Sequence, residues 1–246
     1  MSKKIKKQLA IISNQKISHN TYEMILSSTE NLPKMQAGQF INILLPNLSL
    51  RRPISICDCD NKTITIIYKV VGKGTAYLAE LKDGELDVLI GLGNGYTIID
   101  SKPLLVGGGV GIPPLYLLAK QLLKQGIKPK VILAFNSKSD LFYIDNFKAL
   151  EIEVIVTTID GSYGIKGLAT TPLNELDYNY LYTCGPKAML RALYNHTNIS
   201  GQYSFEERMG CGFGACMGCS TKTNSSNKRI CLEGPVLLKE DIVWTD

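Results

Sequence analysis

Four cysteines near the C-terminus have the residue type and spacing for electron-transfer chemistry. Cys211, Cys216 and Cys219 form a C-x4-C-x2-C run, and Cys231 follows after eleven further residues. Thiolates at this spacing are typical of a plant-type [2Fe–2S] cluster. Such a cluster moves one electron at a time and performs no bond chemistry on a substrate. The spacing therefore predicts an electron carrier, whose donor and acceptor have to be found elsewhere.

Glycines around these cysteines favour an iron–sulfur cluster over other uses of the thiols. Four of them lie between or beside the first three cysteines: Gly210, Gly212, Gly214 and Gly218. Because glycine tolerates positive φ, the loop can wrap a small cluster and turn its N–H groups toward the sulfurs. Structural zinc is the main alternative, although only Cys216 and Cys219 form a C-x2-C pair. Disulfides are disfavoured, because seven cysteines is an odd number and nothing indicates export.

The bulk composition is that of a globular protein with about two domains of ordinary size. The 246 residues are 45% hydrophobic and 20% charged. A net charge of +5 without a concentrated basic stripe argues against a nucleic-acid partner. No window approaches eighteen consecutive apolar residues, so we expect no membrane span and a cytoplasmic protein.

Residues 1–100 predict a small antiparallel β-barrel. Short β-rich runs alternate there with turn residues, at Gln8–Ser13, Tyr22–Ser27, Gln39–Leu45, Ile54–Cys57, Thr63–Val71 and Leu86–Ile90. The glycine-rich segment Gly91–Gly95 then marks a domain boundary.

Residues 101–200 predict an α/β domain with a parallel sheet and helices on both faces. Its expected strands are Pro103–Val106, Lys130–Phe135, Glu153–Thr158 and Tyr180–Thr183. Its expected helices are Pro114–Gln125, Asp145–Leu150 and a segment from Pro186 toward Tyr194. Residues 201–246 show little regular pattern beyond the cysteines, as expected of a small module shaped by its metal.

Two motifs in the barrel region suit a dinucleotide. Arg52-Pro53-Ile54-Ser55 places a guanidinium on a strand, and an arginine fork suits a pyrophosphate. Gly74 and Thr75 precede a predicted helix at Tyr77–Leu81, whose first N–H groups could bind a phosphate. Each motif alone is also compatible with a structural role, as surface charge or as an ordinary turn. Together they favour a bound dinucleotide.

Two further motifs lie at strand ends of the α/β region. Gly107, Gly108, Gly109 and Gly111 fall between a strand and a helix, where a cofactor phosphate would lie. The run does not match G-x-G-x-x-G, and a tight structural turn is the alternative. Cys184-Gly185-Pro186 ends the fourth strand at the carboxyl edge, the side on which such sheets bind ligands. We recognise no nucleophile–base constellation, so no catalytic residue is predicted.

In combination, these motifs resemble the ferredoxin-reductase family of flavoproteins, over nearly the whole chain. Within it they look most like the electron-transfer subunits of class 1B dihydroorotate dehydrogenases. Glu206, Arg208 and Glu233-Gly-Pro235 also match that subfamily. The resemblance implies an FAD-binding barrel over 1–100, an NAD-binding α/β domain over 101–200 and a [2Fe–2S] module over 201–246.

The resemblance also assigns the site residues. FAD would contact Arg52, Pro53, Ile54, Ser55, Ile67, Tyr68 and Lys69, with its phosphates on Gly74 and Thr75. NAD would lie on Gly107, Gly108, Gly109, Gly111, Cys184, Gly185 and Pro186. The cluster ligands would be Cys211, Cys216, Cys219 and Cys231.

The implied enzyme is an oxidoreductase subunit that serves pyrimidine biosynthesis. It would relay electrons between FMN of a separate dihydroorotate dehydrogenase catalytic subunit and NAD+, through the cluster and FAD. A heterotetramer with two copies of each subunit is expected. Alternatives are a related NAD(P)H reductase subunit serving ferredoxin or a sulfur-compound reductase, and a zinc-stapled nucleotide-binding module. NADH rather than NADPH is a family expectation, since Asn136–Lys138 could in principle meet a 2′-phosphate.

Overall fold

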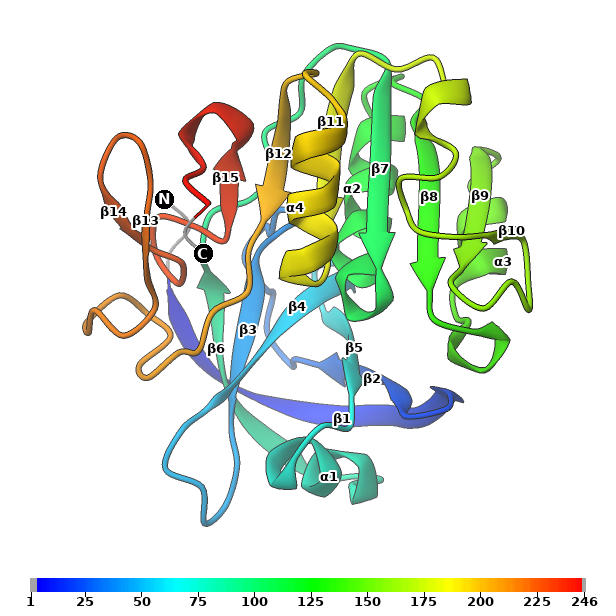
Figure 1. Ribbon diagram of the computed structural model, residues 1–246. Helices are drawn as coiled ribbons and strands as arrows, with labels where there is room; N and C mark the ends of the chain where they lie inside the picture. Colours follow the sequence, from blue (N-terminus) through cyan, green and yellow to red (C-terminus); the bar gives the residue numbers. More distant parts are fainter. Residues whose placement is uncertain (1–3, 245–246) are drawn as a thin grey trace.

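A computed structural model describes residues 4–244 of the chain. The ends of the outer predicted domains, 1–3 and 245–246, lie outside the described residues. Figure 1 shows a barrel below, a sheet with helices above it, and the C-terminal segment beside both. No helix within 4–244 is long and apolar enough to cross a bilayer.

The first part of the chain forms the predicted antiparallel barrel. Its strands close in the order β1-β2-β5-β4-β3-β6. Their bounds are β1 Ile5–Ser18, β2 Thr21–Ser27, β3 Phe40–Leu44, β4 Arg52–Cys59, β5 Thr63–Lys69 and β6 Glu85–Leu92. Helix α1, Lys73–Glu80, begins four residues before the predicted Tyr77–Leu81, because Gly72 and Thr75 already form its first turn.

The second part forms the predicted parallel sheet, in the order β10-β9-β8-β7-β11-β12-β15. Its strands before residue 200 are β7 Pro103–Gly108, β8 Lys130–Phe135, β9 Glu153–Thr158, the edge strand β10 Ile165–Lys166 and β11 Tyr180–Cys184. The helices are α2 Ile112–Leu123, α3 Ile144–Lys148 and α4 Lys187–His196. In Figure 1, α4 lies in front of the sheet and α2 behind it, next to the barrel.

The segment after residue 200 is more regular than expected, which corrects the sequence interpretation. It contains β12 Gly201–Ser204, β13 Ser220–Lys222, β14 Asn227–Arg229 and β15 Val236–Leu238. Strand β12 runs parallel to β11, and β15 pairs antiparallel with β12. Strand β12 could not be recognised from its sequence, because it is polar. Its Gln202 is nevertheless buried, and its side chain donates a hydrogen bond to the carbonyl of Thr97. The sheet therefore extends past the 200/201 boundary, and the division into three domains stays a prediction.

The barrel and the sheet share one hydrophobic core. Buried barrel residues such as Ile56 belong to the same cluster as Leu115 and Leu118 of α2. The hydroxyl of Tyr96, just after the barrel, donates to the carbonyl of Thr183 at 2.9 Å. This packing fixes the carboxyl ends of β7 and β11 opposite the start of β4.

Candidate functional site

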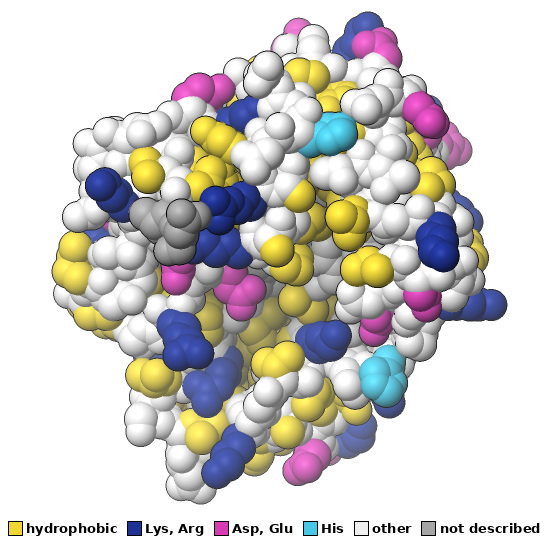
Figure 2. Space-filling view, viewed as in Figure 1, with side chains coloured by type: hydrophobic (Ala, Val, Ile, Leu, Met, Phe, Trp, Pro, Cys, Tyr) yellow, Lys and Arg dark blue, Asp and Glu magenta, His cyan; other side chains and the backbone are white. Residues whose placement is uncertain are grey.

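A cleft of about 590 Å³ opens where the barrel, the sheet and the cysteine segment meet. Its lining includes four predicted FAD residues, Arg52, Pro53, Ile54 and Thr75, together with Gly185 of the predicted NAD corner. Leu190, Phe205, Glu206 and Arg208 line the opposite wall. Figure 2 shows this face hollowed near its middle, with apolar surface inside and Lys and Arg side chains at the edges. The cleft thus has an apolar floor, and its charged lining has more Lys and Arg than Glu side chains.

Arg52 and Gly74 meet at the barrel side of the cleft. A Cβ on Gly74 would collide with the Arg52 guanidinium, so only glycine lets this cation lie against the start of α1. The Thr75 hydroxyl accepts bonds from the N–H groups of Val71 and Gly72 at 2.9 and 3.2 Å. A fixed cation beside a helix N-terminus is the arrangement that phosphates prefer.

Strands β4 and β5 separate beside this cation. Their pairing ends where Ile56 lies opposite Ile66. Within the described chain, residues 52–55 pair with β3 but not with β5. The edges of 52–55 and 67–69 that face each other therefore have backbone groups that are not paired between β4 and β5.

The predicted residues Ile67 and Tyr68 point into the protein. Both are buried, with 2% and 3% of their surface exposed. Tyr68 donates a hydrogen bond to Oδ1 of Asn14 at 2.8 Å and stacks on Tyr22. Burial raises the pKa of Tyr68 to about 12. A ligand would therefore meet this pair through the backbone, and only the neighbouring Lys69 has a partly exposed side chain.

The predicted nucleotide residues of the sheet lie together at one edge. Cys184 at the end of β11 is the register partner of Gly107 in β7. A Cβ on Gly111 would run into the backbone carbonyl of Cys184, and one on Gly108 would press on Pro186 and Met189. These glycines let the two turns pack closely against each other. The sequence alone could not tell this packing role of the glycines from a role in phosphate binding.

Gly109 differs from its neighbours. It has φ +51°, a left-handed value, and a Cβ there would meet nothing within 4 Å. Its N–H and that of the exposed Val110 begin the turn into α2, so a ligand can approach here. Burial raises the pKa of the Cys184 thiol to about 12, so it is not a nucleophile at neutral pH.

The four predicted cluster ligands lie as two pairs. Cys211 and Cys216 have their Sγ atoms 3.4 Å apart and are partly exposed. Cys219 and Cys231 are buried, and the Cys231 N–H lies 3.5 Å from the Cys219 sulfur. Within residues 4–244, no three Cys, His, Asp or Glu side chains are arranged to hold one metal ion. Two pairs match a two-iron cluster, in which each iron takes two thiolates.

The surrounding backbone also fits such a cluster. Burial raises the pKa of the Cys211 thiol, but N–H groups of Cys216, Phe213 and Ala215 outweigh it and lower that pKa to about 6. A Cβ on Gly210 or Gly218 would lie 3.4 or 3.6 Å from the Cys216 sulfur. The glycines thus keep open the space around that thiol, and the donors around Cys211 are those that stabilise bound thiolates.

Residues that the sequence analysis did not single out hold this loop in place. Arg229 donates to the Gly214 carbonyl at 2.6 Å and forms an ion pair with Glu233. Asn42, on β3, donates to the Cys211 carbonyl at 3.3 Å. Neither belongs to a recognisable motif, because each reaches the loop through one bond to a backbone carbonyl, in a segment that is distant in sequence or irregular in structure.

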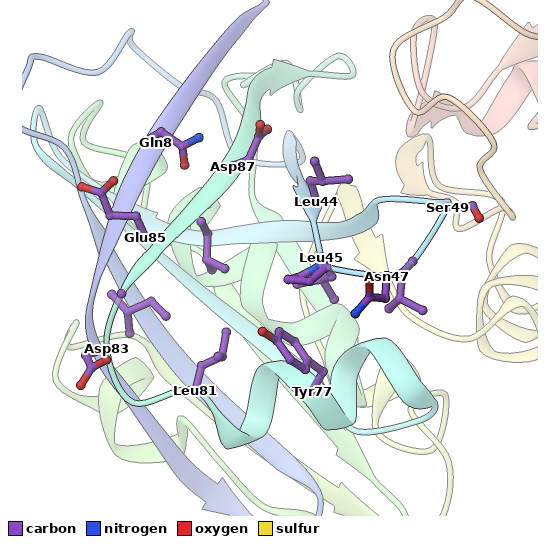
Figure 3. A pocket seen from close by; sticks show the side chains of 15 residues that line it. Gln8, Leu44, Leu45, Asn47, Ser49, Tyr77, Leu81, Asp83, Glu85 and Asp87 are labelled. Carbon is purple, nitrogen blue, oxygen red and sulfur yellow. The ribbon is translucent and has the colours of Figure 1, made fainter.

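A second cavity, of about 800 Å³, contains none of the predicted residues. Figure 3 shows Tyr77 of α1 facing Leu45 and Asn47 of the β3–β4 connection. Asp83, Glu85 and Asp87 lie along its opposite side. These carboxylates would repel a phosphate, so this cavity matches a dinucleotide less well than the first cleft does.

Comparison with known families agrees with this geometry. Residues 206–243 match the model described as the iron–sulfur cluster binding domain of dihydroorotate dehydrogenase B. A dihydroorotate dehydrogenase B (NAD(+)) electron transfer subunit from Fusobacterium nucleatum is 43% identical, over 93% of this chain and 95% of the relative. The subunit of that name from Bacillus pumilus is 42% identical, over 96% and 98%.

Solved structures show a similar arrangement. An NADH-dependent reduced ferredoxin-NADP oxidoreductase, described in the context of flavin-based electron bifurcation, superposes with a TM-score of 0.87. It is 29% identical, over 96% of this chain and 90% of that chain. Phthalate dioxygenase reductase, at 22% identity and a TM-score of 0.66, shares the fold over 78% of this chain and 64% of its own.

Proposed function

The chain belongs to the family of dihydroorotate dehydrogenase B (NAD(+)) electron transfer subunits, and from that premise we propose that it relays electrons for such an enzyme. The relay connects NAD+ with a dihydroorotate-oxidising catalytic subunit. When bound, FAD exchanges a hydride with the nicotinamide and single electrons with a [2Fe–2S] cluster. The observation that carries the proposal is that one cleft brings the predicted FAD residues Arg52–Ile54 and Thr75 next to Gly185 of the predicted NAD corner, with the segment that leads into the cysteine loop as a further wall.

The barrel side of the cleft binds FAD in this proposal. Arg52 neutralises the pyrophosphate, and the N–H groups at the start of α1, next to Gly74 and Thr75, donate to it. The separated backbone of 52–55 and 67–69 holds the flat ring system. Ile54 supplies an apolar surface but no aromatic ring for stacking.

The sheet side binds NAD. Gly109 and Val110 offer N–H groups where the turn is open, and Cys184-Gly185-Pro186 closes the corner next to it. With its pKa near 12, the Cys184 thiol stays neutral and takes no part in proton transfer at pH 7. The corner therefore positions the nicotinamide and does not react with it.

In this proposal the cysteine loop holds the cluster, which exchanges electrons with the partner protein. The pair Cys211 and Cys216 and the pair Cys219 and Cys231 would together hold the cluster. Phe213 and Met217 of the same loop expose 43% and 61% of their surface, a high fraction for apolar side chains. Apolar side chains over a cluster suit contact with a partner protein.

The partner proposed is an FMN-containing catalytic subunit, in a heterotetramer with two copies of each chain. Names of the relatives support a partner, since each is a subunit of a larger enzyme. The compartment proposed is the cytoplasm, where thiols stay reduced, and all seven cysteines are free.

A second candidate is a reductase subunit that exchanges electrons with ferredoxin. The similarity to the NADH-dependent reduced ferredoxin-NADP oxidoreductase, at a TM-score of 0.87, favours this candidate. The two functions share the cofactors and differ in the protein that docks on the cysteine loop.

Anaerobic purification with native partners tests the proposal. We expect a coloured chain with FAD, two irons and two sulfides, retained with an FMN protein that oxidises dihydroorotate only in the complex. Dihydroorotate turnover by the isolated chain would contradict the proposal. Rapid reduction of free ferredoxin without a stable FMN partner selects the second candidate. A colourless chain with one zinc and no flavin refutes both.

A further inference from the structure

Asn42 connects the proposed flavin strand to the cysteine loop. On β3 it is the register partner of Pro53 in β4. Its side-chain Nδ2 donates to the Cys211 carbonyl at 3.3 Å, although 169 positions separate the two residues. One strand pair and one hydrogen bond thus lead from the flavin strand to a proposed cluster ligand.

The loop is shaped to rest on this amide. A Cβ on Gly212 would overlap Nδ2 of Asn42, so only glycine permits the approach. The same glycine has φ +74°, which other residues rarely adopt. Asn42 itself is 1% exposed, so its side chain has little freedom to move away.

The backbone of Asn42 is fixed from the opposite direction. Arg51 donates to its carbonyl oxygen at 3.2 Å and to the carbonyl of Asp87 at 3.1 Å. The same guanidinium pairs with the Asp87 carboxylate at 2.7 Å. Asn42 is therefore held as a rigid support from which the loop is positioned.

The side chain of Asn42 is a poor choice for barrel stability alone. Its Oδ1 is buried and finds no hydrogen-bond partner within residues 4–244. An unpaired buried carbonyl lowers stability, so an apolar residue of similar size would suit the strand at least as well. The use that remains for the amide is its donation to Cys211.

We infer that Asn42 is a positioning residue for Cys211, setting the cluster against the flavin strand and tuning how firmly it is held. The inference rests on the proposed function, because it requires a [2Fe–2S] cluster on these cysteines. Partners behind the ligands of a metal site orient those ligands, and this bond to the Cys211 backbone would do so for the Cys211 thiolate.

The test compares two positions in the full chain, purified anaerobically with its cofactors. Asn42→Leu and the smaller Asn42→Ala both remove the donor to Cys211. The matched control is Asn94→Leu. Asn94 holds the same module at its other end, by bonds to Glu233 and Val236 of 2.8 to 3.1 Å.

We expect both Asn42 variants to lose iron to a chelator about 10- to 100-fold faster than the native chain. Their reduced clusters should also show shifted EPR g values and a shifted midpoint potential. Asn94→Leu should lower the melting temperature and leave the g values and potential unchanged.

Native g values, potential and iron release in the Asn42 variants would overturn the inference. If Asn42→Leu does not fold, Asn42→Ala decides by the same measurements. A native chain without any cluster would instead refute the proposed function, so the two failures are distinguishable.

Discussion

The cleft and the cysteine loop are built in opposite ways. Around the cleft, the predicted residues lie on strand ends that are fixed by ladders on at least one side, as Cys184 is by β7 and β12. The loop over 211–219 has no strand of its own and receives side-chain bonds from Asn42, Lys4 and Arg229. The cleft therefore forms with the fold, whereas the loop depends on what it binds.

The largest effect should come from removing a buried thiol of the loop. Cys219→Ser is expected to abolish the cluster, because metal binding contributes on the order of 10 kcal/mol to small metal-dependent segments. The iron content of the purified variant measures the loss of the cluster. Amide hydrogen exchange should become faster in residues 205–235 and stay unchanged in β7 and β8. Cys184→Ser should keep the cluster. If Cys219→Ser also lost FAD and its barrel amides exchanged faster, the cleft would depend on the cluster as much as the loop does.

A change at Arg52 should affect the cleft alone. Arg52→Lys keeps a charge but loses the guanidinium fork, and we expect FAD affinity to fall by about 1.5–3 kcal/mol. Flavin titration of the stripped protein measures this. Arg51→Lys is the contrast, because Arg51 bonds to Asn42 and Asp87 and should lower the melting temperature instead. Equal FAD losses in both variants would show that Arg52 has no special role.

Gly111 tests the backbone contact between the two turns of the sheet. Gly111→Ala places a methyl group against the Cys184 carbonyl, so we expect about 1–3 kcal/mol less stability and weaker NADH binding. Chemical denaturation and NADH titration report the two effects. Gly72→Ala, where a Cβ meets nothing within 4 Å, is the stability control. An unaffected Gly111→Ala protein would mean that the turns are free to separate.

The smallest effect should come from Asp87. Its burial acts to raise the carboxyl pKa, but bonds from Lys6 and Arg51 outweigh this and lower it below 3.8. The carboxylate therefore stabilises the barrel above pH 3.8, and this contribution is lost as the pH falls through the lowered value. Asp87→Asn should cost about 1 kcal/mol at pH 7. The melting temperatures of the native protein and of Asp87→Asn should become equal in acid. A difference in melting temperature that does not change with pH would contradict a stabilising role of the Asp87 carboxylate.

Elements with strong local patterns were predictable. Lys130–Phe135 and Glu153–Thr158 have the predicted bounds, because their apolar and β-branched runs indicate buried parallel strands. Strand β12 was missed, since Gly201-Gln-Tyr-Ser is buried by its neighbours in the sheet and not by its own hydrophobicity. The acidic cavity beside Tyr77 also had no local signal, because residues from three separate segments line it.

The sequence by itself determined the chemistry that is available to this protein. The signals for this chemistry are local: the cysteine spacing, the glycine turns and the Arg52–Ser55 motif. Local patterns can be recognised without knowledge of the fold. Only the tertiary structure decided which distant residues touch: Gly111 and Cys184, Arg52 and Gly74, and Asn42 and the cysteine loop. Such contacts join residues far apart along the chain and depend on how the barrel and the sheet close on each other.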